Sequence, residues 1–211
     1  SINACLVASV TTANTLADLC ERIGADWGEI VPALRLDARI GPQAYLAPGL
    51  GIAGGNLERD LATIARLARQ TGADAGTVEA FIADSRHRKE WVVHRLHSEV
   101  FPQYTDPRIA VWGLAYKENT RSIKNSPALA LLDRLKGRSV SCYDPVVRLD
   151  SLPEYAVQVG SALEACAGAD VLVVMTKWQE FAEIDPASVA QTMSGRQVIE
   201  PFSGLDGGRY A

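Results

Sequence analysis

The pattern of apolar residues changes near the middle of the chain, and this change constrains the fold more than any other feature. Up to about residue 100, apolar residues recur every three or four positions, as on the buried face of amphipathic helices. From residue 109 onward they form short valine-rich runs that alternate with helical segments. Such alternation is typical of a parallel sheet covered by helices on both faces. The sequence therefore predicts an α/β protein in which a helical region precedes a parallel-sheet domain.

The helical region is expected to hold a long opening helix, a short second helix and two further helices. The opening helix ends at Gly24, since glycine readily takes the left-handed conformation of a helix end. Asp26 can cap the second helix, whose regularity Pro32 limits. The third helix ends at Gly72, and the fourth spans about 77–100. The apolar positions of these helices are Leu6, Val10, Ala13, Ala17 and Cys20, then Leu57, Leu61, Ile64 and Leu67, then Val78, Phe81, Ile82, Trp91, Val92 and Leu96.

The second region is expected to hold parallel strands with helices between them. The strands are predicted at Ile109–Trp112, Ser139–Tyr143, Ala156–Val159, Val171–Met175 and Gln197–Ile199. The helices are predicted near Pro127–Lys136, Ser161–Ala167 and Pro186–Met193. Residues 101–108 contain two prolines and are expected to form a linker. The predicted domains are therefore 1–101 and 107–211.

Composition excludes several classes of protein. The chain has 211 residues and a net charge of −4, so no basic excess favours nucleic acid or anionic lipid. No stretch approaches the roughly 18 apolar residues that cross a bilayer. Cys5, Cys20, Cys142 and Cys166 lie far apart without metal-ligand spacing, and we expect reduced thiols in the cytoplasm. His94 and His97 could share a metal, but no acidic residue completes such a site, so solvated histidines are expected.

A basic loop follows the first predicted strand, which ends at Gly113. Ser126 is a good N-cap and Pro127 suits the first position of the next helix, whose free N–H groups favour an anion. The loop adds positive charge at Lys117, Arg121 and Lys124. A phosphate or pyrophosphate site and a solvated basic loop explain this pattern about equally well. The segment has one glycine, so the G-x-G-x-x-G dinucleotide fingerprint is absent.

A glycine-rich loop, 47–55, precedes the third predicted helix. Glycine permits positive φ and lets a ligand approach the backbone. Asn56 follows the loop, and Asp60 lies one turn later on the same helix face. These residues form a candidate active site. The alternative is a tight turn with an Asn cap, which spacing alone favours.

These segments, in this order, resemble the UDP-glucose/GDP-mannose dehydrogenase family. The matching segments are Asn3-Ala4 through Asn14, Ala17–Glu21, Gly24-Ala25-Asp26, Asp37–Gly41, Pro48–Asp60, Gly113–Lys117, Thr120, Ser126-Pro127, Tyr143-Asp144-Pro145, and Thr176-Lys177-Trp178 with Phe181. The family has an N-terminal NAD-binding Rossmann domain, a central helical dimerisation region and a C-terminal Rossmann-like domain that binds the nucleotide sugar. The chain resembles the last two parts over nearly its whole length. The resemblance thus implies a helical dimerisation region followed by a Rossmann-like parallel-sheet domain.

The resemblance also implies roles for individual residues. Asp60 matches the family's catalytic aspartate, and Asn3 would sit at the sugar. Arg39 would reach across a dimer to the sugar nucleotide. The other expected substrate-binding residues are Gly54, Gly55, Tyr116 and Lys117. Lys124 stands in the place of a family arginine near the NAD phosphates.

The chain departs from the family at the glycine loop. The family oxidises a sugar CH₂OH to a carboxylate in two hydride transfers to NAD, through a thioester on a cysteine. Asn56 stands where that cysteine is expected, and an amide is not a useful nucleophile. Arg59 replaces the family's lysine, and the catalytic lysine would lie before Ser1. Because the chain begins inside or just before a helix, we expect a preceding segment. The resemblance implies that this segment is the domain that holds most of the NAD site.

Two functions are therefore expected. The first is the C-terminal portion of an NAD-dependent nucleotide-sugar dehydrogenase of polysaccharide biosynthesis, in which full oxidation to the acid is doubtful and this portion alone is inactive. The second is an impaired module for nucleotide-sugar binding or dimerisation. A homodimer is expected through the opening helix, which carries apolar residues on two sides: Leu6, Val10 and Ala13 on one, Leu16, Leu19 and Ile23 on the other. No nucleic acid, membrane or metal partner is expected.

Overall fold

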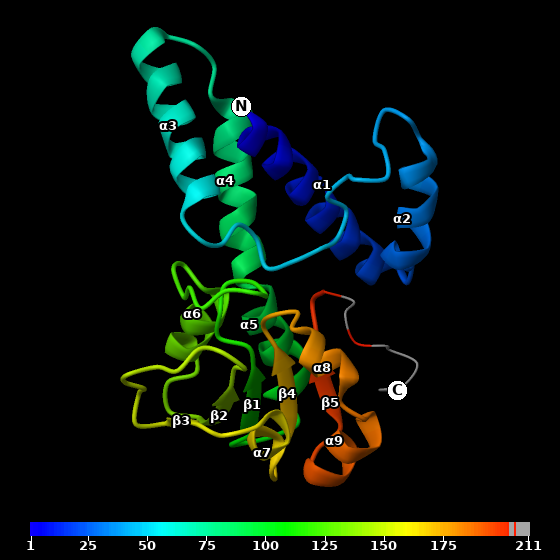
Figure 1. Cartoon of the computed structure of the whole chain (residues 1–211), viewed down its shortest axis with the longest axis vertical. Helices are drawn as coiled ribbons and strands as arrows, with labels where there is room; N and C mark the ends of the chain where they lie inside the picture. Colours follow the sequence, from blue (N-terminus) through cyan, green and yellow to red (C-terminus); the bar gives the residue numbers. More distant parts are fainter. Residues whose placement is uncertain (203–204, 206–211) are drawn as a thin grey trace. The chain divides into compact units, whose positions relative to one another are not determined.

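The computed structural model describes residues 1–202 and 205, in two compact units. We call Ser1–Lys89 the helical unit and the chain from Glu90 onward the sheet unit. Figure 1 shows the helices of the first and the strands of the second. Within the described residues, no helix is long and apolar enough to span a membrane.

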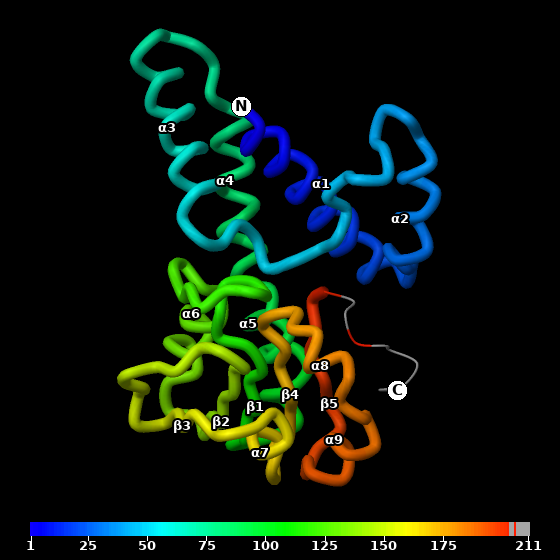
Figure 2. Tube along the Cα trace, in the orientation of Figure 1, coloured from blue at the N-terminus to red at the C-terminus, as the bar shows by residue number. Residues whose placement is uncertain are grey.

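The helical unit consists of α1 (Ile2–Ile23), α2 (Trp27–Leu36), α3 (Asn56–Thr71) and α4 (Gly76–Lys89). The predicted helix ends are confirmed, because Gly24 and Gly72 are left-handed, with φ of 74° and 75°. The predicted cap is confirmed too: the Asp26 side chain accepts a hydrogen bond from the N–H of Gly28. Pro32 lies inside α2, which nevertheless continues to Leu36. The long connection from α2 to α3 can be followed in Figure 2.

Two apolar clusters form the core of the helical unit. The cluster around α2 contains Ala13, Ala17, Cys20, Trp27 and Leu46. The cluster at the start of α1 contains Val7, Ile52 and Leu61, so it joins α1 to the glycine loop and α3. On α3 the expected apolar face is wrong at Leu67, which is 48% exposed; Ala65 and Ala68 are buried instead. The small side chains of these alanines let α3 lie close to α1 and α4, the helices that it contacts.

The predicted single helix over 77–100 is wrong, because it is interrupted at Glu90. Beyond α4 the chain forms α5 (Trp91–Arg95) and a π-helical turn, η1 (Leu96–Val100). The N–H of Phe101 bonds to the carbonyl of Leu96 at 2.9 Å, which is the wider spacing of a π-helix. Val92, Leu96 and Val100 are buried, so their spacing continues the helical pattern across the change in geometry.

The sheet unit is built on five parallel strands in the order β3-β2-β1-β4-β5. The strands are β1 (Arg108–Trp112), β2 (Ser139–Tyr143), β3 (Ala156–Gln158), β4 (Val171–Val174) and β5 (Gln197–Ile199). The helices are α6 (Pro127–Arg134), α7 (Ala162–Cys166), α8 (Gln179–Glu183) and α9 (Pro186–Thr192). The predicted α/β class, the parallel sheet and every predicted strand are confirmed. Helix α8 is an addition to the prediction.

The strand order places a topological switch at the centre of the sheet. The chain proceeds outward from β1 to β2 and β3, then returns to the other side of β1 with β4 and β5. Both central strands are buried, with Ile109–Trp112 and Val171–Val174 each at most 2% exposed. Ligands of such sheets bind beyond the carboxyl ends of the strands where the order reverses. In this unit, those ends lead into the loops after Trp112 and after Val174.

Candidate functional site

A buried carboxylate ties together the loops at the carboxyl end of the sheet. Asp144, which is fully buried, follows β2. One oxygen accepts hydrogen bonds from the N–H groups of Leu114 and Ala115 at 2.7 and 3.0 Å, and from the indole of Trp178 at 3.2 Å. The other accepts from the N–H groups of Val146 and Val147. One side chain thus fixes the backbone that leaves β1, β2 and β4.

A close approach of two loops fixes the start of the basic segment. Gly113 has a φ of +92°, and a Cβ atom there would lie 2.5 Å from Cβ of Thr176. The Thr176 hydroxyl donates to the carbonyl of Ala115 at 2.6 Å. The Ser126 hydroxyl donates to the carbonyl of Leu114 at 2.7 Å and accepts from the N–H of Ala128. The predicted cap of α6 is therefore confirmed, and Ser126 also holds the loop.

The basic side chains of this segment are exposed above that framework. Lys117, Arg121 and Lys124 are all exposed, as is Lys177 after β4. The Lys117 ammonium lies 5.8 Å from the centre of the Tyr116 ring. Tyr116, Lys117 and Lys124 thus belong to one loop, which follows β1. Exposed ammonium groups at the carboxyl ends of β1 and β4 can attract a phosphate.

Beside this framework, Tyr143 at the end of β2 pairs with a helix residue. Its hydroxyl donates to the Glu180 carboxylate at 2.8 Å. Burial, and then this bond to a carboxylate, raise the pKa of Tyr143 to about 12. The phenol is therefore protonated at neutral pH and holds α8 to β2.

In the helical unit, the structure brings together two of the predicted site residues. The amide of Asn3 on α1 donates to the Asp60 carboxylate on α3 at 2.6 Å. The Arg59 guanidinium contacts the other Asp60 oxygen at 3.2 and 3.3 Å. The bond from Asn3, and then that from Arg59, hold the pKa of Asp60 below its ordinary value. Asp60 is thus a carboxylate at neutral pH, able to accept a further hydrogen bond.

Polar side chains from two helices hold the glycine loop. Asn14 on α1 accepts from the N–H of Gly49 at 2.8 Å, and Arg88 on α4 donates to the carbonyl of the same residue at 2.7 Å. Ser85 on α4 accepts from the N–H of Ile52 at 2.7 Å. Asn14, Ser85 and Arg88 are 2%, 6% and 4% exposed, respectively. The path of the loop therefore depends on buried hydrogen bonds.

The loop ends at the first turn of α3. Gly54 is left-handed, with a φ of 78°, and Gly55 is the N-cap of α3. Asn56 is the first helical residue and its side chain is exposed. The alternative that Asn56 caps the helix is therefore wrong. Its amide is available to solvent rather than used by the backbone.

The remaining predicted substrate contact, Arg39, lies in the turn after α2. Its guanidinium forms a two-pronged pair with Asp37, at 2.9 and 2.6 Å. These bonds lower the pKa of Asp37 and raise that of Arg39. The Arg39 side chain is 90% exposed. It is therefore presented to solvent on the helical unit.

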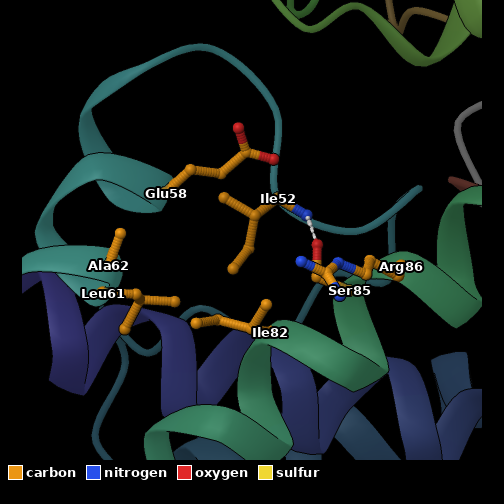
Figure 3. A pocket seen from close by; sticks show the side chains of 7 residues that line it. All are labelled: Ile52, Glu58, Leu61, Ala62, Ile82, Ser85 and Arg86. Atoms are coloured by element: carbon orange, nitrogen blue, oxygen red, sulfur yellow. Dashed lines mark hydrogen bonds between the residues drawn. The ribbon is translucent and has the colours of Figure 1, made fainter. Parts of the chain in front are cut away.

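A cavity of about 280 Å³ lies beneath the glycine loop (Figure 3). It is lined by Ile52, Glu58, Leu61, Ala62, Ile82, Ser85 and Arg86. Figure 3 shows Ile52 above Leu61 and Ile82, with the Ile52–Ser85 hydrogen bond at its edge. Packing beneath the loop is thus incomplete at this point.

Among the described residues, no cluster of histidine, cysteine, aspartate or glutamate could hold a metal ion.

Comparison with known proteins identifies both units. Residues 1–84 match the UDP-glucose/GDP-mannose dehydrogenase family, central domain. Residues 110–206 match the UDP binding domain of the same family. The chain belongs to the UDP-glucose/GDP-mannose dehydrogenase family. The resemblance inferred from the sequence motifs is therefore confirmed.

Relatives of this dehydrogenase family match nearly the whole chain. UDP-glucose 6-dehydrogenase AglM of Haloferax volcanii is 33% identical over 97% of the chain and 49% of its own length. UDP-glucose 6-dehydrogenase of Rhizobium meliloti is 32% identical over 94% of the chain and 46% of its own length. The chain thus spans about half the length of these curated relatives.

Solved structures confirm the fold. The structure described as UDP-D-ManNAc dehydrogenase from Pyrococcus horikoshii has a TM-score of 0.81 at 24% identity, covering 97% of this chain and 47% of that one. A UDP-glucose dehydrogenase from Pyrobaculum islandicum has a TM-score of 0.79 at 21% identity, covering 96% and 49%. The helical unit and the Rossmann-like sheet are thus both architectures of this dehydrogenase family.

Several residues that build the candidate site of this chain were not predicted as site residues. Asp144, Thr176 and Asn14 entered the sequence analysis only as parts of the family resemblance. Ser85 and Arg88 were not singled out at all. A buried polar residue is the signal that could have found them, because burying a polar group requires a hydrogen-bond partner. Burial cannot be recognised in a single sequence where such a residue lies beside charged residues, as Ser85 and Arg88 do at the end of α4.

Proposed function

We propose that this chain supplies the central and nucleotide-sugar-binding portions of an NAD-dependent dehydrogenase that oxidises the CH₂OH group of a UDP-sugar. The family match over both domains, in their family order, carries this proposal. The proposed functional parts are residues 1–101 for dimerisation and residues 107–211 for the nucleotide sugar. We favour UDP over GDP because the matched domain is described as UDP-binding. The exposed lysines at the switch point supply positive charge, which can attract the diphosphate of a UDP-sugar.

The proposed substrate-binding residues come from both units. In the helical unit they are Asn3, Arg39, Gly54 and Gly55, with Arg39 serving the site of a partner subunit. In the sheet unit they are Tyr116 and Lys117. The support is chemical: Asn3 and Lys117 offer hydrogen-bond donors, and a glycine has no side chain that would keep a ligand from the loop backbone. The proposed general base is either Asp60, which Asn3 and Arg59 hold as a carboxylate, or the catalytic lysine that the family resemblance places before Ser1.

The cofactor contact proposed for this chain is limited. NAD accepts the hydride in this chemistry when bound, and we propose that a preceding domain holds most of it. Lys124 is exposed on the loop after β1, and its single ammonium group fits one phosphate contact. The chain's other proposed residues orient the sugar and accept its proton. This portion alone is therefore proposed to be inactive.

Asn56 sets the proposed limit of the reaction. It occupies the position that the family resemblance gives to the nucleophilic cysteine, and its amide cannot form a thioester. We therefore propose that oxidation stops at the aldehyde, after one hydride transfer.

The second candidate function, a binding or dimerisation module without catalysis, is favoured by the same observation. Asn56→Cys in a protein joining both units to the NAD-binding domain separates the two. Recovery of four-electron oxidation supports the enzyme, and no NADH from either protein supports the module.

Calorimetry on the 211-residue chain tests the nucleotide proposal directly. UDP and UDP-glucose are expected to bind, and GDP is expected to bind at least about tenfold more weakly. Lys117→Ala is expected to weaken UDP binding, with Lys136→Ala as the control on an exposed lysine after α6. Absence of heat with both UDP and UDP-glucose would contradict the proposal.

Two further properties belong to the proposal. We propose a homodimer formed through α1, supported by the exposure of Leu16, Leu19 and Ile23 at 37%, 49% and 68%. We also propose a cytoplasmic location, supported by unpaired thiols of the kind that reducing compartments maintain.

A further inference from the structure

Arg88 is a buried charge attached to the glycine loop. It belongs to α4 and is 4% exposed. Its Nε–H donates to the carbonyl of Gly49 at 2.7 Å, whereas the Asp18 carboxylate on α1 is 4.0 Å from Nη1. A bond to a charged donor is stronger than one between neutral groups. The shortest polar contact of this buried guanidinium therefore restrains the loop backbone rather than a carboxylate.

A cavity borders the loop close to Gly49. Ile52, three residues after Gly49, lines this cavity of about 280 Å³ (Figure 3). Ile52 also packs with Val7 and Leu61 and is only 4% exposed. Gly51, between them, has a φ of +75°, and its backbone passes so close to α4 that an added Cβ would lie 2.5 Å from the carbonyl oxygen of Ser85. The loop thus lies against α4 in a conformation that polar contacts maintain.

We propose that Arg88 is a positioning residue, which sets the conformation of the glycine loop through its Nε–H bond to Gly49 and thereby the position of Gly54 and Gly55, where the loop would meet the sugar. The role of Gly54 and Gly55 rests on the proposed function. The restraint by Arg88 does not, and it can be measured without any ligand. Arg88 itself touches neither substrate nor cofactor in this proposal.

Two substitutions of equal length isolate this hydrogen bond. In glutamine, the side-chain nitrogen is joined to Cδ, as Nε is in arginine, so Arg88→Gln can place an N–H donor at the same point. Arg88→Met has the same reach without a donor. Both remove the charge, so the difference between them reports the hydrogen bond alone. Arg88→Lys keeps the charge but has a methylene group in place of Nε.

Hydrogen–deuterium exchange on the whole 211-residue chain measures the restraint. The amides of 49–55 are expected to exchange at least about tenfold faster in Arg88→Met than in the native chain, because the Ile52 N–H depends on the loop's position. Arg88→Gln is expected to stay close to the native rate. Amides inside α3, such as that of Ala65, serve as the internal control. Equal loop exchange in the native, Met and Gln chains overturns the proposal. If Arg88→Met does not fold, Arg88→Lys takes its place, and native exchange in that variant overturns the proposal.

A comparison of two ligands tests whether the restraint serves the sugar. The probes are UDP and UDP-glucose, each titrated into the native chain and the three variants. Arg88→Met and Arg88→Lys are expected to lose the tighter binding of UDP-glucose over UDP while their Kd for UDP stays within about twofold of the native value. Arg88→Gln is expected to keep the tighter binding of UDP-glucose over UDP. An equal weakening of both ligands, or no change in either, overturns the positioning role. If the native chain binds UDP-glucose no better than UDP, the proposed sugar site fails, and the exchange experiment alone decides the restraint.

Discussion

The amide nitrogen of Asn3 lies 2.6 Å from a carboxylate oxygen of Asp60, which joins the first turn of α1 to the second turn of α3. The bond connects residues 57 positions apart in the chain. An amide N–H that donates to a carboxylate favours the ionised form. A residue expected at the sugar thus favours the ionised form of the expected catalytic aspartate.

Asn3→Leu is expected to raise the pKa of Asp60 toward its ordinary value near 3.8, because the larger of the two bonds that lower it is lost. A carboxylate with a lowered pKa stabilises the folded state above the unfolded pKa, and that contribution is lost as the pH falls through the folded pKa. The stability difference between the native chain and Asn3→Leu should therefore narrow in acid. Carboxyl ¹³C NMR titration measures the pKa, with Asp74 as an exposed reference. An unchanged Asp60 midpoint contradicts the expected coupling.

Gly113→Ala is expected to destabilise the sheet unit by more than about 3 kcal/mol, from a left-handed alanine and a direct clash together. The added Cβ would lie 2.5 Å from Cβ and 2.6 Å from Oγ1 of Thr176. Gly137→Ala is the matched control, because its φ is +82° and nothing lies within 4 Å of an added Cβ. The control should cost about 1–2 kcal/mol. Urea unfolding measures both, and equal costs would show that the Thr176 contact is unimportant.

Asp144→Asn is expected to destabilise the chain by about 2–4 kcal/mol. Both carboxylate oxygens accept N–H donors, from Leu114, Ala115 and Trp178 on one and from Val146 and Val147 on the other. In asparagine, one of these positions becomes an NH₂ group that faces other donors. Asp150→Asn, on an exposed residue of the same unit, should change the free energy of unfolding by less than about 0.5 kcal/mol. A similarly small change in the free energy of unfolding of Asp144→Asn would mean that the loops relax around the new amide.

Local signals in the sequence predicted most of the fold. Gly24 and Gly72 end helices through backbone geometry that few other residues adopt, and Ser126 with Pro127 starts α6 for an equally local reason. The valine-rich runs predicted the strands, most directly β1 and β4, because these two strands are buried on both faces. The helix break at Glu90 was missed, because Trp91, Val92 and Leu96 continue the apolar spacing of the preceding helix.

The candidate site was less predictable than the fold. The basic loop could be predicted because Lys117 and Lys124 lie in the same short segment of the chain as Ser126, the cap of α6. The partners of Asp144 come from three loops, and those of the glycine loop come from α1 and α4. Such hydrogen bonds depend on which distant segments pack together. Composition and spacing carry no information about that pairing.

Only one of the four thiols is expected to react in the folded chain. Cys5 is exposed, whereas Cys20, Cys142 and Cys166 are buried. Burial raises the pKa of Cys142 to about 11 and that of Cys166 to about 12. At pH 8, an aromatic disulfide reagent should therefore modify Cys5 rapidly and the others only in denaturant. Cys5→Ser should remove the rapid phase, and a rapid phase that persists contradicts the assignment.

The same two thiols predict the alkaline stability of the sheet unit. A thiol whose folded pKa is raised stays neutral in the folded state, while the unfolded thiol ionises near pH 9. The stabilisation is complete below the unfolded pKa and is lost as the pH rises through the folded pKa. The midpoint of urea unfolding should therefore fall above pH 9, and Cys142→Ala with Cys166→Ala should reduce the slope of that fall. An unchanged slope would mean that other groups cause the loss of stability at alkaline pH.

Leu19→Glu is expected to convert the proposed homodimer to a monomer. Leu19 on α1 is 49% exposed, and a charge on an apolar helix face must be desolvated if that face meets a second copy. Leu67→Glu is the matched control, because Leu67 on α3 is 48% exposed but lies outside the proposed interface. Light scattering should give twice the 22.7 kDa chain mass for the native chain and for Leu67→Glu, but a single chain mass for Leu19→Glu. A dimer that survives Leu19→Glu would place the interface elsewhere than on this face of α1.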